Sequence, residues 1–183
     1  MKDEYVIVLD FLPSGHSLGR REPIAQAIGE KYFSLLELII RKDVTVKHGD
    51  RLYIGNDDRK EVDHIKRRIN MKGLTNFAKS ELEYVVKKIV DADEERFVKF
   101  FNMAQPISTR LHQLELLPGI GKKHMWHLID EKEKGDFKSF KDLSERVKLL
   151  PDPKEMIIKR IMKEIENDHE RFRLFVLRFV RRY

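Results

Sequence analysis

The stretch LHQLELLPGIGKK, residues 111–123, decides how the second half of the chain is organised. It predicts an apolar helix that ends in a tight turn with glycines two positions apart, followed by a helix that opens with lysines. Glycine at both positions lets the backbone turn without a Cβ and approach a ligand closely. The amides of the turn and of the new helix's first residues lack intrahelical acceptors, so with the helix dipole they favour an anion. The predicted phosphate receptor consists of Pro118, Gly119, Ile120, Gly121, Lys122 and Lys123.

This segment is similar to the helix-hairpin-helix motif of DNA- and RNA-binding proteins. The similarity continues into GDFKSFKDL, residues 135–143, which resembles the stretch that commonly follows the first hairpin of such domains. In proteins of this kind, carbonyls beside the glycines hold potassium or sodium, which bridges to the phosphate. The resemblance therefore implies a monovalent cation, K+ or Na+, on the backbone carbonyls of Glu115, Leu117 and Ile120, since oxygen ligands suit a hard ion. No other cofactor is expected.

A second, altered hairpin is predicted 33 residues further along the chain. Residues 149–154, LLPDPK, repeat the Leu-Leu-Pro of residues 116–118 and precede a helix expected over 155–166. Both glycines are replaced, by Asp152 and Lys154, and the Asp152 carboxylate would repel a phosphate. We therefore expect a tandem arrangement in which the second hairpin serves packing and only the first binds. A chance repeat of Leu-Leu-Pro is the alternative.

The N-terminal residues 1–57 have an all-β pattern. Residues 5–12, YVIVLDFL, are rich in β-branched and aromatic side chains and end at Pro-Ser-Gly, which predicts a strand. Residues 32–40 predict a second strand. Residues 44–47 and 51–54 predict a hairpin with Gly49 in its turn. Short strands separated by glycine and aspartate turns favour a small barrel or sandwich.

Helical periodicity begins after residue 57. Apolar residues at positions 62, 65 and 69 fall at helical spacing, so a helix is expected over 58–71. Ser80 and Glu83 match a capping box ahead of an amphipathic helix, and Asp93 can cap the helix after it. The phenylalanines of that later helix, at positions 97, 100 and 101, are expected in the core.

Together these segments predict an α+β protein. The expected domains are an OB-like β-barrel with a trailing helix over residues 1–72, connecting helices over 73–105, a helix-hairpin-helix domain over 106–170 and a basic C-terminal strand or tail over 171–183. Over nearly its full length the chain resembles an uncharacterised archaeal family with an N-terminal oligonucleotide/oligosaccharide-binding (OB) type of barrel and a C-terminal helix-hairpin-helix domain. The resemblance rests on residues 5–12, 47–54, 73–75 and 117–123, and it implies nucleic-acid binding by architecture.

Composition narrows the class of function. The 183 residues include no cysteine, which excludes disulfide scaffolds, thiolate metal sites and cysteine nucleophiles. Charged residues make up 37% of the chain, and the formal net charge of +6 favours a polyanionic partner. The last thirteen residues contain five arginines and no acid, and residues 171–180 are predicted to form a strand. No apolar stretch reaches membrane-spanning length and the start of the chain is no signal peptide, so a soluble cytoplasmic protein is expected.

Several other residues are candidate sites. His124 and His127 have a spacing that can hold a metal, but no third ligand is evident. Trp126 could stack on a base or sugar, although packing against a neighbouring element is the commoner role. The loop over residues 14–21 could recognise a phosphate or be a solvated loop, and Lys66, Arg67 and Arg68 are expected on a solvated helix face. The acids of residues 91–95 suit helix starts, and no catalytic site is evident.

The sequence therefore predicts a non-enzymatic nucleic-acid-binding protein that grips the sugar–phosphate backbone through the first hairpin. RNA is favoured over DNA, because a small barrel and a basic tail suit single strands or structured RNA. One alternative is a protein–protein interaction module in a ribosome or transcription assembly. A metal-dependent nuclease is a further alternative, for which residues 91–95 are the only candidate acidic cluster.

Overall fold

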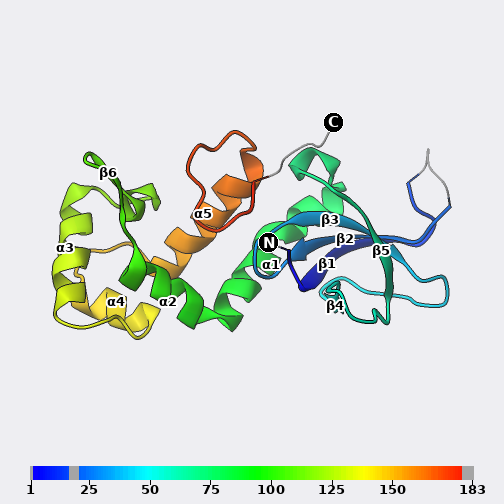
Figure 1. The fold of residues 1–183 in the computed structure, drawn as a ribbon, viewed down its shortest axis with the longest axis horizontal. Helices are drawn as coiled ribbons and strands as arrows, with labels where there is room; N and C mark the ends of the chain where they lie inside the picture. The colour runs from blue at the N-terminus through cyan, green and yellow to red at the C-terminus, as the bar shows by residue number, and fades with distance from the viewer. Residues whose placement is uncertain (1, 17–20, 179–183) are drawn as a thin grey trace. The chain divides into compact units, whose positions relative to one another are not determined.

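The structure is a computed structural model that describes residues 2–16 and 21–178 (Figure 1). The fold is of the α+β class, and the chain forms two compact units. The sheet unit comprises residues 1–85 and 164–183, and the helical unit comprises residues 86–163. The unit boundaries fall inside two helices, whereas the boundaries predicted from the sequence fell at residues 72, 105 and 170.

The helices and strands have the following bounds. The sheet unit contains β1 (Tyr5–Leu12), β2 (Ile24–Gly29), β3 (Leu35–Ile40), β4 (Arg51–Tyr53), β5 (Val62–Arg68), the 3-10 turn η1 (Met71–Gly73) and the first part of α1 (Asn76–Ala92). The helical unit contains α2 (Glu94–Met103), β6 (Pro106–Ser108), β7 (Leu111–His112), the 3-10 turn η2 (Gln113–Leu116), α3 (Lys122–Glu133), α4 (Phe140–Arg146) and most of α5 (Pro153–Glu166). No helix among the described residues is both long and apolar enough to span a bilayer.

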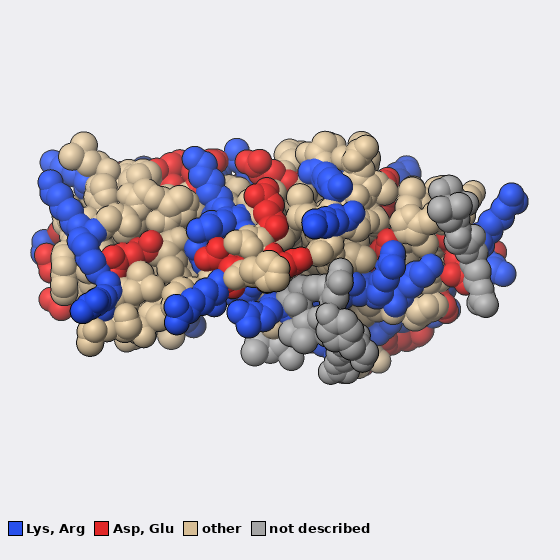
Figure 2. All heavy atoms as spheres, turned by 90° about the horizontal axis from the view of Figure 1, so that it is seen from above, with Lys and Arg blue, Asp and Glu red and all other residues tan. Residues whose placement is uncertain are grey.

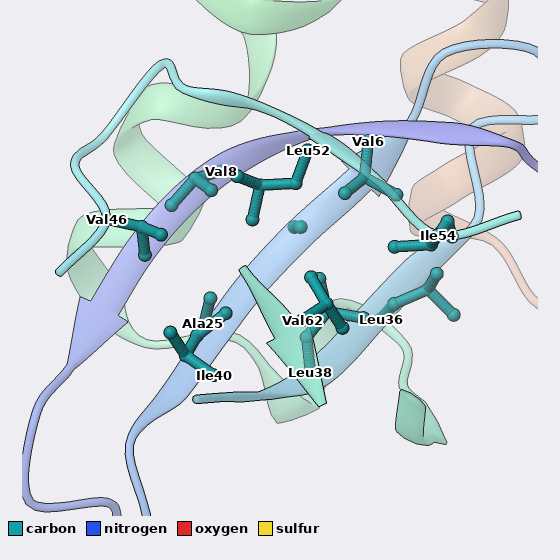
Figure 3. Packing of buried hydrophobic residues seen from close by; sticks show 11 residues of the cluster. Val6, Val8, Ala25, Leu36, Leu38, Ile40, Val46, Leu52, Ile54 and Val62 are labelled. Carbon is teal, nitrogen blue, oxygen red and sulfur yellow. The ribbon is translucent and has the colours of Figure 1, made fainter. Parts of the chain in front are cut away.

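The sheet unit is built on a curled five-stranded antiparallel sheet, a half-barrel with strand order β4-β1-β2-β3-β5 (Figure 1). Alternate residues of the strands project into its concave side, because successive side chains of a strand point to opposite faces. This core includes Val6 and Val8 of β1, and Leu36, Leu38 and Ile40 of β3 (Figure 3). The structure confirms the strand predicted over residues 5–12 and locates the second one at 35–40.

Strand β2 was not predicted, because its sequence carries no alternation. All six of its residues are buried, as are all six of β3, so both faces of these central strands are covered. A strand covered on both faces has no polar side to mark its period. Its short run, IAQAIG, also includes alanine and glycine, which have low β-propensity.

The predicted helix over residues 58–71 is wrong: this segment contains β5, which pairs antiparallel with β3. Two register shifts interrupt that pairing, so Leu36, Leu38 and Ile40 face residues 68, 65 and 62. Residues two apart on β3 therefore match residues three apart on β5. A β-bulge adds an unpaired residue to one strand, and this spacing of three imitates the period of a helix.

The predicted hairpin over residues 44–54 is also wrong. Residues 44–47 form no strand, and β4 pairs with β1 instead. Gly49 does lie in a turn, with φ of +84°, and its amide donates to the carbonyl of Val8 at 2.8 Å. Val46 is buried in the half-barrel core without belonging to a strand. The turn at Gly49 was predicted correctly, but the strand after it, β4, pairs with β1, which lies far away in the sequence.

Helix α1 begins earlier than predicted. Its cap is Thr75, whose Oγ1 accepts the amide of Ala78 at 3.0 Å, whereas the Ser80 hydroxyl donates to the carbonyl of Phe77 within the helix. Buried Gln26 of β2 accepts the amide of Thr75 at 2.8 Å, which fastens the helix start to the sheet. The capping box predicted at residues 80 and 83 is therefore wrong, although the helix is confirmed.

The strand predicted over residues 171–180 is wrong for the described residues 171–178, which form no regular element. Their amides find another acceptor: the buried carboxylate of Glu164 accepts the amides of Leu174, Phe175 and Val176 at 2.8, 3.1 and 2.9 Å. Arg68 of β5 donates to the carbonyl of Leu177 at 2.5 Å. The Glu164 side chain thus accepts the backbone amides that a neighbouring strand would otherwise bond. Residues 179 and 180 lie outside the described residues.

In the helical unit, α2 starts after Asp93 as predicted, although the Asp93 side chain makes no capping hydrogen bond. Phe97 and Phe101 are buried in the core, as expected, and Phe100 is partly buried. The apolar helix predicted before residue 117 is reduced to the single turn η2, because residues 106–108 and 111–112 form the short hairpin β6–β7 instead. The helix expected over residues 155–166 is α5, which begins at Pro153.

Candidate functional site

The turn at residues 117–121, here called the glycine turn, depends on Gly119. The φ of this residue is +86°, in the left-handed region that side chains with a Cβ rarely adopt. Ile120 points into the core, and its amide donates to the carbonyl of Leu117 at 3.2 Å. Pro118 and Gly119 remain exposed. The turn is thus anchored from inside by Ile120 and presents its outer backbone to solvent.

Gly121 is the N-cap of α3 and serves a different purpose. Its backbone is extended, with φ of −96°, and its carbonyl accepts the amide of Met125 at 3.0 Å. That is the first bond of the helix, so the amides of residues 122–124 precede it and have no intrahelical acceptor. A Cβ placed on Gly121 would meet no atom within 4 Å. The start of α3 is therefore uncovered, and its amide donors can be reached from outside.

The two lysines after the turn have different environments. The Lys122 ammonium donates to the carbonyl of Arg110 at 2.8 Å and to Oε2 of Glu115 at 2.9 Å. The hydrogen bond from Lys122 lowers the pKa of Glu115, with burial opposing it. Lys123 is exposed and pairs with no carboxylate among residues 2–16 and 21–178. Lys123 is therefore the uncompensated charge beside the helix start, and Lys122 is held back against the β6–β7 hairpin.

The turn at residues 147–152, here called the proline turn, repeats part of this geometry. The amide of Leu150 donates to the carbonyl of Val147 at 3.3 Å, as that of Leu117 does to Leu114 at 3.1 Å, which matches the shift of 33 residues. Asp152 precedes α5, and its Oδ1 accepts the amide of Glu155 at 3.0 Å. The proline turn therefore reaches its helix two residues sooner, and Lys154 lies inside α5 rather than in place of Gly121.

The two turns touch each other inside the helical unit. A Cβ on Gly119 would lie 3.0 Å from Cγ of Pro151, so the proline packs against the face of the glycine. The helix starts after the two turns nevertheless differ in chemistry. The Asp152 carboxylate accepts the amide of Glu155 in the first turn of α5, whereas no side-chain hydrogen bond caps the start of α3. Of these two helix starts, that of α3 is the one open to an external anion.

The other candidate sites named from the sequence have the following environments in the structure. Lys66, Arg67 and Arg68 lie on strand β5 rather than on a solvated helix face, and Nε of Arg67 donates to the buried Glu37 at 2.6 Å. Within residues 91–95, Glu94 accepts the amide of Phe140 and Asp91 pairs with Lys154. No group of three or more potential metal ligands occurs among the described residues, His124 and His127 included. Of the loop over residues 14–21, positions 17–20 lie outside the described residues.

Trp126 does not pack as expected: 58% of its surface is exposed. It lines a cavity of about 360 Å³ between the β6–β7 hairpin and α3, together with Lys122 and His112. The sequence did not predict this cavity, because the residues before the glycine turn were expected to form a helix and not the β6–β7 hairpin. The only signal was the spacing of Lys122 and Trp126, which places both on one face of α3.

Comparisons with known proteins match most of the chain. "Uncharacterized protein MJ0038" of Methanocaldococcus jannaschii is 47% identical over 175 residues, which covers 95% of this chain and 80% of that protein. The crystal structure of Af1531 from Archaeoglobus fulgidus is similar with a TM-score of 0.86 and 46% identity, and the match covers 96% of this chain and 100% of that one. The model of the family "Protein of unknown function (DUF655)" matches residues 2–177. The chain therefore belongs to this family, which has archaeal members.

Proposed function

We propose that the protein binds the sugar–phosphate backbone of a nucleic acid at the glycine turn and performs no catalysis. The observation that carries this proposal is the uncovered start of α3, where Gly121 leaves the amides of residues 122–124 without partners and Lys123 lies beside them. Backbone amides at a helix start hydrogen-bond an anion, and the helix dipole adds to the attraction. The phosphate diesters of a nucleic-acid backbone are such anions, and as a polyanion the backbone attracts a basic protein.

The pair of turns supports a tandem helix-hairpin-helix as the framework of this site. In that framework Pro151 of the second hairpin supports the first by packing on Gly119. Asp152 accepts the amide of Glu155 at the start of its own helix and adds a negative charge there. Binding is therefore assigned to the first hairpin alone. The half-barrel, interpreted as an OB-like fold, is proposed as a second binding surface.

Contacts to the backbone carry no information about sequence, so recognition is proposed to depend on charge and backbone shape. RNA is favoured over DNA because a small barrel and a basic C-terminal segment suit single strands and folded RNA. The cation of the helix-hairpin-helix interpretation would lie on the carbonyls of Glu115, Leu117 and Ile120. Of these, the carbonyl of Leu117 already accepts the Ile120 amide, and its second lone pair would serve the ion.

The test is a fluorescence-anisotropy titration of labelled RNA and DNA of matched sequence at several salt concentrations. Lys123→Glu is expected to weaken binding by about tenfold or more, because one phosphate contact is lost and a repelling charge is added. Lys148→Glu is the matched control, since it makes the same change of charge on an exposed residue of the proline turn. Equal losses from both variants, or no binding to either polymer at low salt, would overturn the proposal.

A further inference from the structure

The cavity beside α3 has the size and composition of a pocket for one planar ring. Its volume of about 360 Å³ lies at the lower end of the range for small-molecule sites. The end of α2 and the β6–β7 hairpin form one side, and α3 forms the other. Buried Met125 and Leu128 of α3 supply apolar surface, and Trp126 stands beside them. The cavity lies wholly within the helical unit.

Trp126 is the one tryptophan of the chain, and more than half of its surface is exposed. Tryptophan is a large apolar residue that gains most from burial, so an indole left exposed at the wall of a cavity has surface available to a ligand. Every nucleobase has a flat π-face that stacks on such a ring, so stacking does not depend on which base is present. The aromatic wall therefore suits a base better than it suits an aliphatic ligand.

His112 supplies a directional polar group in the same cavity. The residue is only 8% exposed, and its Nδ1 accepts the amide of Leu114 at 3.2 Å. Burial lowers the pKa of His112, with Glu115 opposing and Lys122 reinforcing that shift, so the ring is neutral at pH 7. A neutral imidazole that accepts at Nδ1 carries its proton on Nε2. No partner for Nε2 occurs among the described residues, so this N–H is free to donate to a ligand.

The cavity reaches the start of α3, directly after the glycine turn. Lys122 is the first residue of α3 and also lines the cavity, and Trp126 follows one turn later on the same face. Four residues of α-helix rise by about 6 Å. Arg110 lines the same cavity on the β6–β7 side, and its exposed side chain adds positive charge. A phosphate at the start of α3 would thus have its own or the neighbouring base within reach of Trp126.

We propose that this cavity is a nucleobase pocket, in which Trp126 stacks on one unpaired base and Nε2 of His112 donates to an acceptor atom on that base. The inference rests on the proposed backbone contact at the glycine turn and names its substrate class as single-stranded nucleic acid. A base inside a duplex is stacked on both faces and cannot enter. The pocket accepts different bases, because stacking and one donor discriminate little among them.

Trp126 is its own reporter, since no other tryptophan contributes fluorescence. The experiment titrates the protein with a single-stranded oligonucleotide and with an abasic oligomer of the same length, and it follows both tryptophan emission and the anisotropy of a label on the oligomer. We expect both oligomers to bind, and only the one with bases to quench Trp126. A duplex of the same sequence is expected to bind without quenching.

Variants separate stacking from folding. Trp126→Ala is expected to weaken binding of the base-containing oligomer about tenfold and leave the abasic oligomer unaffected, with Trp126→Phe between them. Tyr84→Ala is the matched control, because it removes an aromatic ring that is 52% exposed in the sheet unit. For His112→Gln the quantity measured is the ratio of the affinities for the base-containing and the abasic oligomer. A loss of binding caused only by damage to the fold would leave this ratio unchanged.

The outcomes distinguish this proposal from the one on which it rests. Binding of both oligomers with equal emission changes, or an unchanged affinity of Trp126→Ala, would overturn the base pocket and leave the backbone contact standing. Absence of binding by either oligomer would overturn both. Quenching by the duplex equal to that by the single strand would also exclude a pocket for an unpaired base.

Discussion

Gly119 and Gly121 occupy one turn for different physical reasons. Gly119 has φ of +86°, and a Cβ there would also crowd Pro151, so its role is conformational. Gly121 has an extended backbone that any residue adopts, and the space around its Cα is open. The lack of a side chain at Gly121 is therefore not needed for folding. It keeps the amides of α3 uncovered, which is the property that the proposed function uses.

Alanine substitutions are expected to separate these two roles. Gly119→Ala should lower the free energy of unfolding by about 1–2 kcal/mol, the cost of left-handed backbone for a residue with a Cβ. Gly121→Ala should lower it by less than about 1 kcal/mol, since alanine is only a poorer N-cap. Urea denaturation of the two variants measures the difference. Equal losses would show that Gly121 is also required by the fold.

A substitution at Gly121 should affect nucleic-acid affinity more than it affects stability. Gly121→Val places a branched side chain over the first amides of α3 without strain on the backbone, so binding should weaken while the unfolding midpoint stays close to that of the parent. Anisotropy titration and urea denaturation of one preparation give both quantities. Unchanged affinity would exclude these amides from the binding site.

At the level of elements, the strands of the sheet unit are joined by a buried polar cluster around Glu37 of β3. Its carboxylate accepts Nε of Arg67 at 2.6 Å and Nε2 of Gln26 at 3.2 Å, and Nε2 of His16 lies 2.7 Å away. Burial acts to raise the pKa of Glu37, but the hydrogen bonds from Arg67, His16 and Gln26 outweigh it and lower the pKa below its ordinary value. The cluster ties the edge strand β5 to the central strands.

This cluster makes stability depend on pH in a predictable direction. Because the folded-state pKa of Glu37 lies below its unfolded value, its contribution is fully present above pH of about 4.5 and is lost as pH falls through the lowered value. Glu37→Gln should therefore destabilise the protein at pH 7 by about 1–3 kcal/mol and flatten the loss of stability on acidification. Glu145→Gln, on the surface of α4, is the control. Parallel pH profiles for all three proteins would contradict this account.

The glycine turn, taken as an element, is expected to depend on the monovalent cation. If the carbonyls of Glu115, Leu117 and Ile120 hold K+ or Na+, replacing these ions by Li+ at constant ionic strength should weaken nucleic-acid binding, because the smaller ion fits the carbonyl spacing poorly. The anisotropy titration measures it, with Lys123→Glu as the reference for a damaged site. Equal affinity in all three salts would leave the amides and lysines as the whole site.

On the scale of the whole molecule, the face drawn in Figure 2 carries charges of both signs. Lys and Arg side chains alternate with Asp and Glu on the face drawn in Figure 2, and the formal net charge is +6 for 183 residues. Such a surface gives only a modest general attraction for polyanions. Specific affinity must then come from a few phosphates bound at a defined site.

Salt dependence should therefore be measurable. We expect affinity to fall roughly tenfold to a hundredfold for each tenfold rise in salt concentration, since one or two phosphates release their counterions. Scrambling the oligonucleotide sequence should change affinity by less than about threefold, because backbone contacts carry no sequence information. A strong sequence preference would show that base edges are read somewhere on the molecule.

The sequence by itself determined the features that depend on neighbouring residues. The strand at residues 5–12, the turn at Gly49, and the helices that follow residues 93 and 152 reflect β-branched runs, turn glycines and apolar periodicity, which act over a few positions. The glycine turn belongs to this group, and the start of α3 lies where the sequence predicted it. The helix expected before that turn does not, because the β6–β7 pairing takes its residues.

Only the tertiary structure decided the features whose partners lie far along the chain. Bulges in the pairing with β3 give β5 an apolar spacing that resembles a helix. Burial of both faces leaves β2 without the alternation that predicts a strand. The carboxylate of Glu164 satisfies backbone amides ten to twelve residues away and so replaces a predicted strand with irregular chain. Backbone groups must be paired wherever they are buried, and the partner is set by what lies nearby in space. For the same reason the sequence located the lysines, but only the fold drew Lys122 to Glu115 and left Trp126 at the wall of a cavity.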